Sequence, residues 1–269
     1  MKKIIKKIIP KSIYFKSAEF FLYQKYKKLL KDNKKLKNQY KGKRCFIIGN
    51  GTSINKMNLN LLRNEYVFAM NYFYNYKDFF SIKPSFFSCI EPINSNPNFT
   101  FNHFKELIAK YDKIGEVLPE MIFFFNISYQ NYIIKNNLFK NNHVCYLKSL
   151  FPLLQSRILQ DDISRPHSFM DGSIYNAIAC CVYMGFKIIY FLGCDCDWFS
   201  NKGATHFYDE KKREMESSNN EKLFYNNYLT LKKWRLVTNY FKSKNVQIIN
   251  CGVGGDNDIC DRINFQSLF

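Results

Sequence analysis

Seven short apolar runs, spread along the chain from residue 44 onward, constrain the fold more than any other feature of the sequence. Each run has the length of a strand and is almost continuously apolar or aromatic, as buried parallel strands require. The runs are RCFIIG (44–49), YVFAMN (66–71), SFFSCI (85–90), MIFFFN (121–126), HVCYL (143–147), IIYFLG (188–193) and VQIINC (246–251). Helical patterns lie between them at 101–111, 169–185 and 220–244. This alternation predicts an α/β fold: a Rossmann-like three-layer domain with a mostly parallel sheet.

The positive charge of the chain is concentrated at its N-terminal end. The 269 residues contain 40 Lys and Arg against 22 Asp and Glu. Residues 1–44 hold sixteen of the basic residues and two of the acidic ones, a net charge of +14, so the rest of the chain carries 24 basic and 20 acidic residues, or +4. We therefore divide the chain into a basic segment, 1–43, and an α/β domain, 44–269.

The basic segment has the pattern of amphipathic helices. Isoleucine pairs beginning at Ile4 and Ile8 recur among lysines, and a second helix is expected to begin with Ser17 as its N-cap and to continue through 20–38. Lysines on such helices are attracted to anionic lipid. We expect attachment to an anionic membrane surface, with a solvated leader as the alternative. We do not expect nucleic-acid binding, because the aromatic residues are not interleaved as stacking platforms.

Cysteine use and hydropathy indicate a cytoplasmic protein, placed by its basic segment at the inner face of the cell membrane. Nine cysteines, an odd number without regular spacing, fall mostly inside apolar runs and argue against a disulfide framework. Cys194 and Cys196 are too close in sequence for the usual zinc knuckle. Lysines interrupt the start MKKIIKKIIPK, unlike a secretory signal, and the longest apolar stretch, 177–194, reads as helix, turn and strand.

Polar residues follow four of the predicted strands at their carboxyl ends, where parallel sheets bind ligands. These ends are GNGTS (49–53), MNY (70–72), CIEPIN (89–94) and GCDCDW (193–198). Gly49 and Gly51 would let backbone amides approach a phosphate, and Thr52 or Ser53 would cap a following helix. A plain strand-to-helix turn uses the same glycines. Asn71 offers an amide to a ribose, base or phosphate, with a local turn cap as the alternative.

The stretch DCDWFSNKGATHFYDE, 195–210, gathers the densest set of reactive side chains. Loops of this length and polarity in compact α/β domains are commonly functional. Asp195 and Asp197 would chelate a divalent cation with a nucleotide diphosphate, or Asp195 would bind backbone amides or substrate hydroxyls without metal, which we favour. His206, beside Tyr208, suits general-base work because imidazole exchanges protons near neutral pH. An exposed surface histidine is the alternative.

A second candidate histidine, His167, precedes a predicted helix that starts near Gly172 and Ser173. The N-terminus of that helix would favour an anion. Whether either histidine is a base depends on where the fold places it.

The motifs IIGNGTS, FAMN and the GS-containing helix start followed by AIACCVYMGFKIIYFLGCD resemble the bacterial lipooligosaccharide sialyltransferases that use CMP-sialic acid. The sequence is also similar to the hydroxymethylpterin-diphosphokinase-like domains of surface-polysaccharide loci, in which G-x-D-x-x-W followed by H-F-Y recurs. The resemblance covers about residues 44–252. It implies a GT-A variant of the Rossmann-like fold that transfers a nonulosonic acid from a CMP-sugar with inversion and without metal or other cofactor.

Site residues follow from the resemblance by position. It implies that Gly49, Asn50 and Gly51 contact the nucleotide phosphate and sugar and that Asn71 contacts the nucleotide. It also implies that Gly172 and Ser173 contact the cytosine or carboxylate region. Tyr208 is the nearest match to the family's tyrosines that assist the departing phosphate.

One departure from the sialyltransferase pattern concerns the base. The family's catalytic histidine lies close to the helix before the last strand, and the corresponding stretch here, 217–234, contains none. Either His206 supplies the base from a different position, or the chain is a relative with another chemistry.

The leading hypothesis is therefore a glycosyltransferase that takes a nucleotide-sugar donor and a glycan or glycolipid acceptor at the cell surface; a homo-oligomer is compatible with it. The alternatives are a metal-dependent transferase with Asp195 and Asp197 as a DxD motif for a UDP- or GDP-sugar, and a diphosphotransferase that consumes ATP. The non-enzyme alternative is an inert α/β scaffold that carries a membrane-binding or nucleic-acid-binding leader.

Overall fold

The seven predicted strands are all present in the structure, a computed structural model. It describes residues 11–95, 99–156, 158–197, 200, 206–208 and 220–269. The strands are β1 (Arg44–Ile48), β2 (Tyr66–Met70), β3 (Phe86–Cys89), β4 (Ile122–Asn126), β5 (His143–Leu147), β6 (Ile188–Leu192) and β7 (Gln247–Asn250). Four residues of each of β1, β2 and β6 and all of β3 and β4 are buried, which explains their unbroken apolar composition.

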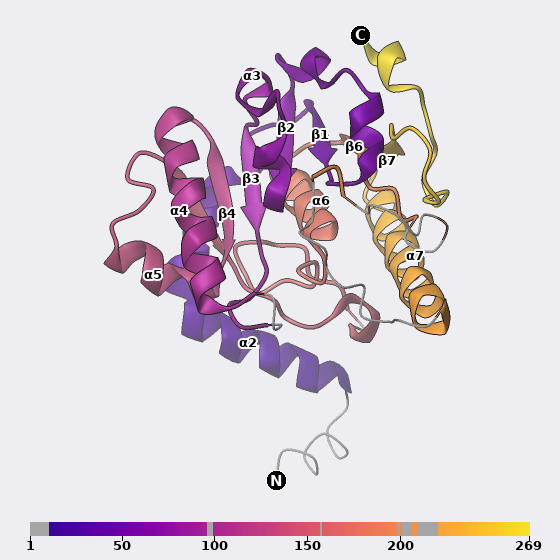
Figure 1. The fold of residues 1–269 in the computed structure, drawn as a ribbon. Helices are drawn as coiled ribbons and strands as arrows, with labels where there is room; N and C mark the ends of the chain where they lie inside the picture. Colours follow the sequence, from indigo (N-terminus) through magenta and orange to yellow (C-terminus); the bar gives the residue numbers. More distant parts are fainter. Residues whose placement is uncertain (1–10, 96–98, 157, 198–199, 201–205, 209–219) are drawn as a thin grey trace. The chain divides into compact units, whose positions relative to one another are not determined.

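The strands form one sheet in the order β5-β4-β3-β2-β1-β6-β7. Figure 1 labels all of these strands except β5. The pairs β1–β2, β1–β6, β2–β3, β4–β5 and β6–β7 are parallel. Ile48 lies opposite Ala69 on one side and Leu192 on the other, so β1 is an interior strand. The α/β, Rossmann-like prediction is confirmed.

The three helices predicted in the α/β part are also observed. The α-helices are α2 (Lys11–Leu30), α3 (Phe79–Ile82), α4 (Phe101–Val117), α5 (Gln130–Lys135), α6 (Ser173–Tyr183) and α7 (Asn220–Lys242). The 3-10 helices are η1 (Lys31–Leu36), η2 (Thr52–Lys56), η3 (Leu59–Leu62), η4 (Asn71–Asn75), η5 (Ile127–Tyr129), η6 (Leu153–Gln155) and η7 (Phe265–Leu268). None of the described helices is both long enough and apolar enough to cross a membrane.

The chain divides into two compact units. Unit 1 comprises residues 1–39 and 89–183, and unit 2 comprises residues 40–88 and 184–269. In unit 1, α2 and η1 contact β5, and the buried side chain of Asn33 donates hydrogen bonds to the carbonyl oxygens of Tyr146 and Ile163. The proposed boundary at residue 43 stays a prediction.

The expected helix start at Ser17 is wrong, because Ser17 lies inside α2. Side chains that precede Ser17 already pack on unit 1: the ring of Phe15 lies 4.4 Å from that of Phe151 and Tyr14 lies 6.1 Å from it, between centroids. Tertiary packing therefore sustains the helix before the residue that looked like a cap. The isoleucine pairs at Ile4 and Ile8 lie outside the described residues.

Candidate functional site

The sheet reverses its order between β1 and β6. From β1 the chain proceeds to β2 on one side, whereas from β6 it proceeds to β7 on the other. In open parallel sheets ligands bind beyond the carboxyl ends of the strands at such a switch point. The predicted polar ends of β1, β2 and β6 all belong to unit 2, so the fold brings three of the four together at this edge.

Glycines at the end of β1 are needed for close backbone packing against β6. The amide of Gly49 donates to the carbonyl oxygen of Leu192 at 2.8 Å, and that of Gly51 donates to Gly193 at 2.9 Å. A Cβ on Gly49 would overlap the Gly193 carbonyl oxygen, which no side chain tolerates. These two amides are thus engaged within the protein, and a phosphate here would need other donors.

Asp195, which follows β6, joins the ends of β1 and β6. Its Oδ1 accepts a hydrogen bond from the Ser53 hydroxyl at 2.5 Å, and its Oδ2 accepts one from the Ser53 amide at 3.0 Å. The side chain is buried. Burial raises the pKa of the Asp195 carboxyl above its usual value, while the hydrogen bonds from Ser53 oppose that rise. Asp195 therefore positions the β1 loop.

The helix expected after β1 is not formed as predicted. The segment folds as the five-residue 3-10 helix η2, whose N-cap is Gly51, and no side chain caps it. The hydroxyl and the amide of Ser53 both donate hydrogen bonds to Asp195 instead. A long-range contact therefore replaces the local helix cap that the sequence predicted. The expected helix N-terminus for an anion is therefore absent after β1, and a ligand contact of Thr52 stays a prediction.

A glycine-rich loop after β7, which the sequence analysis missed, covers the backbone of Asp195. The amide of Asp256 donates to the Asp195 carbonyl oxygen at 2.7 Å. Gly255 has a φ of +76°, and a Cβ there would lie 2.6 Å from the same oxygen. The Arg262 guanidinium holds the loop by donating to the carbonyl oxygens of Gly252 and Gly254. The glycine-rich sequence GVGGDN (252–257) is the signal from which this loop could have been predicted.

The segment 206–208 lies against the end of β1. The amide of Phe207 donates to the carbonyl oxygen of Asn50 at 2.9 Å. Its ring packs on those of Phe73 and Tyr76, with centroids 6.1 and 5.8 Å away. A backbone bond and an apolar anchor thus fix the residue between His206 and Tyr208, the two predicted catalytic side chains.

Half-buried rings form a row beside this anchor. His206 stacks on Tyr208 with centroids 5.2 Å apart and planes 12° apart, and Tyr208 lies 5.2 Å from Tyr72. Tyr72 in turn lies 6.1 Å from Tyr74. We call these four residues the aromatic row. Flat, partly exposed rings suit a base or a sugar ring, and the hydroxyls add polar contacts.

Two asparagines face the same edge of the sheet. The Asn50 side chain donates to the carbonyl oxygen of Met70 at 3.4 Å, and its buried Oδ1 has no hydrogen-bond partner among the described residues. Asn71 begins η4 with a φ of 51°, a left-handed conformation that asparagine tolerates better than most residues. Both side chains lie at the ends of β1 and β2, and a contact of either with a ligand stays a prediction.

The two carboxylates of the DxD pair have different surroundings. Asp195 is occupied by Ser53, whereas Asp197 is partly exposed. In the described part of the chain, no three His, Cys, Asp or Glu side chains gather as a metal site. The structure describes all nine cysteines and none of them forms a disulfide, and burial raises the pKa of the Cys196 thiol to about 12. Trp198 and most of loop 195–210 lie outside the described residues.

Unit 1 holds the remaining predicted residues. Helix α6 begins at Ser173, directly after Gly172, as predicted. His167 is fully buried; its Nδ1 accepts from the Phe169 amide at 3.4 Å, and its Nε2 has no partner among the described residues. Burial lowers the pKa of His167 to about 4. This histidine is a neutral core residue.

Comparisons with known proteins concern the family and the fold. The profile of the family described as "6-hydroxymethylpterin diphosphokinase MptE-like" matches residues 21–201, more than half of the chain. No curated protein matches. A solved structure described as "Structure of MAf glycosyltransferase from Magnetospirillum magneticum AMB-1" is similar, with 13% sequence identity and a TM-score of 0.50. The match covers 92% of the present chain and 39% of the solved one, so the present chain spans less than half of the length of that glycosyltransferase. At this identity the likeness shows a glycosyltransferase-like fold.

Proposed function

Because the chain belongs to the 6-hydroxymethylpterin diphosphokinase MptE-like family, we propose that it is a transferase that binds a nucleotide donor at the carboxyl ends of β1, β2 and β6. The observation that carries this proposal is the hydrogen bond from the Phe207 amide to the Asn50 carbonyl oxygen. It holds His206 and Tyr208 beside the switch point of the sheet. The similarity of the fold to that of a glycosyltransferase supports the same reaction class.

We propose a CMP-sugar as donor and a glycan or glycolipid as acceptor. In this reaction His206 takes the proton of the acceptor hydroxyl, while the oxygen of that hydroxyl bonds to the sugar. The bond from the sugar to the phosphate breaks with inversion, and CMP leaves. The Tyr208 hydroxyl donates to the departing phosphate oxygen. The aromatic row would hold the nucleotide, together with the side chains of Asn50 and Asn71.

The contacts of Asp195 favour chemistry without a metal bound to a DxD motif. A cation at Asp195 would have to replace two hydrogen bonds that Ser53 donates, one from its backbone amide and one from its hydroxyl. Removing such bonds from a buried carboxylate is costly. We therefore propose Asp195 as a positioning residue. Contacts of Gly49, Gly51 and Thr52 with the donor stay predictions, as do those of Gly172 and Ser173 in unit 1.

The family match favours one second candidate, a diphosphotransferase. Its donor would be ATP and its acceptor a small alcohol such as a hydroxymethylpterin. His206 would take the proton of the alcohol, the alcohol oxygen would bond to the β-phosphorus, and AMP would leave. Magnesium on the triphosphate is expected in such a reaction.

A thermal-shift panel on the full chain separates these candidates. CMP, CDP, UDP, GDP and ATP would each be added with manganese, with magnesium and with EDTA. A CMP-dependent rise in Tm that survives EDTA supports the CMP-sugar proposal. A rise with UDP or GDP that needs manganese would assign the site to a DxD transferase. A rise with ATP and magnesium, followed by AMP release when a hydroxymethylpterin is added, would identify the diphosphotransferase.

No shift with any nucleotide would contradict the whole proposal and favour the non-enzyme scaffold. The function of the protein would then have to lie in the basic segment, residues 1–43.

A further inference from the structure

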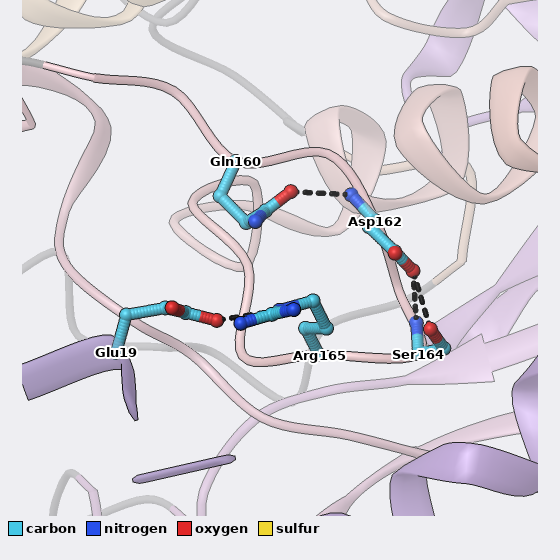
Figure 2. Close-up of polar contacts among 5 residues, drawn as sticks. All are labelled: Glu19, Gln160, Asp162, Ser164 and Arg165. Carbon is cyan, nitrogen blue, oxygen red and sulfur yellow. Dashed lines mark hydrogen bonds and ion pairs between the residues drawn. The ribbon is translucent and has the colours of Figure 1, made fainter. Parts of the chain in front are cut away.

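One face of α2 is held tightly by the rest of unit 1. The Glu19 carboxylate accepts from the Arg165 guanidinium at 2.6 Å (Figure 2). Asp162 accepts from both the amide and the hydroxyl of Ser164, which orders the loop that presents Arg165. The Arg165 guanidinium also lies 4.7 Å from the centre of the Tyr23 ring. The side chains on this face of α2 therefore serve contacts within unit 1.

The opposite side of α2 exposes three apolar side chains, around the polar residues Ser17 and Gln24, and the residues that the structure describes leave it uncovered. Ile13, Phe20 and Phe21 are 54%, 53% and 70% exposed. At 100° per residue these three positions fall within one third of the helix circumference. Two exposed phenylalanines side by side are unusual on a free surface and are typical of a contact surface.

The charge on this outer face has a single sign. The exposed lysines on α2 are Lys16, Lys25, Lys27 and Lys28. Glu19 is the one acidic residue of α2, and its ion pair with Arg165 turns it away from the exposed arc. The outer face thus combines apolar side chains with four cations and no anion.

We infer that the outer face of α2 binds an anionic lipid surface, with Phe20 and Phe21 inserted among the acyl chains near the headgroups. Aromatic side chains that enter the interface and lysines that meet phosphates are the two requirements of such binding. The inference stands apart from the proposed reaction, since it uses unit 1 alone. It would also place an enzyme of lipid-linked acceptors beside its substrate.

Two other occupants fit the face less well. A second copy placed by two-fold symmetry would bring the same four lysines of each chain together without an opposing charge. A nucleic-acid duplex would satisfy the lysines and leave the apolar side chains of Ile13, Phe20 and Phe21 against a polar backbone.

Vesicle cosedimentation with the full chain tests the inference. Vesicles of phosphatidylcholine alone would be compared with vesicles that contain an equal part of phosphatidylglycerol. We expect binding to the anionic vesicles, weakened by salt. The pair F20S/F21S should weaken it about tenfold or more, and K27Q/K28Q should weaken it about fivefold for each lysine. The matched controls are F80S, which changes a phenylalanine of α3 that is 50% exposed, and K110Q/K113Q on α4.

Unchanged binding of both α2 variants, with Tm values equal to that of the parent, would overturn the inference. So would tight binding of a DNA or RNA duplex that competes with the vesicles and is lost in K27Q/K28Q. Dimerisation abolished by F20S/F21S in the absence of lipid would assign the face to a second copy. Failure of the nucleotide panel would leave the vesicle result unaffected, so the two proposals fail separately.

Discussion

The loops that follow β5 and β6 each contain a histidine that the sequence marks as a candidate base, and the fold treats the two differently. His167, after β5, is fully buried with Nδ1 hydrogen bonded to a backbone amide. His206, after β6, is half-buried and stacks on Tyr208 beside the end of β1. The difference shows that the residues next to a histidine in the sequence do not reveal whether it can act as a general base. A base needs both access for the acceptor and an anchor that holds it at the strand ends.

The largest expected effect concerns His206. H206A should lower turnover by about 10²- to 10⁴-fold, because a general base contributes that much. Nucleotide binding should stay nearly unchanged, since the anchor is the Phe207 amide and ring. Turnover by single-point assay and the nucleotide-induced rise in Tm would be measured for H206A and for the control H103A. Retained turnover in H206A would remove His206 from the mechanism.

The next effect concerns His167 and pH. Its pKa is lowered to about 4 in the folded chain from about 6.5 in the unfolded chain, so the unfolded state binds the proton more readily. The neutral form stabilises the fold fully above about pH 6.5, and the free energy of unfolding should fall by about 3 kcal/mol as pH drops to 4. Urea unfolding at several pH values would show this slope in the parent.

H167Q lacks the titrating group and should have a flatter pH profile than the parent. Equal profiles for both chains would mean that His167 is accessible to protons in the folded state, and the contrast between the two histidines would be lost.

A moderate effect is expected from the contact that fixes the β1 loop. D195N should destabilise the chain by about 2 kcal/mol, because hydrogen bonds to a buried charge are lost or reversed. S53A removes one of those bonds, so the double variant should cost less than the sum of the two single variants. Chemical unfolding of the four chains gives the coupling. Strict additivity would show that the Asp195–Ser53 contact does not join β1 to β6.

The smallest effect concerns the ion pair of Glu19 with Arg165 in unit 1. The Arg165 side chain is 37% exposed, so solvent screens the attraction. E19Q should lower the free energy of unfolding by about 0.5 kcal/mol and leave turnover unchanged. An effect as large as that of D195N would mean that α2 supports the fold much more strongly than the candidate site does.

Strands could be read from the sequence because burial on both faces leaves a continuous apolar signal. IFFFN is β4 and was predicted within one residue. The helix start of α6 at Ser173 was also predicted, and the suspected kinship with hydroxymethylpterin-diphosphokinase-like domains is confirmed by the family match. Periodicity and local motifs carry such features directly.

Long-range contacts could not be read in this way. Ser53 resembles a helix cap but binds Asp195, which is 142 residues away. Ser17 resembles a cap but lies within α2, because Tyr14 and Phe15 pack on Phe151. The order reversal between β1 and β6 depends on strand order, which the apolar runs do not encode. The roles of the site residues themselves stay predictions.

Hydrogen exchange of the full chain, with and without the nucleotide that raises Tm, tests the central claim most directly. We predict slower exchange in the peptides that contain Asn50, Tyr72 and Phe207, because the donor would lie on the edge formed by β1, β2 and the segment 206–208. Peptides from α2 should exchange at an unchanged rate. Protection that avoids those three peptides and appears elsewhere would contradict a donor site at the switch point of the sheet.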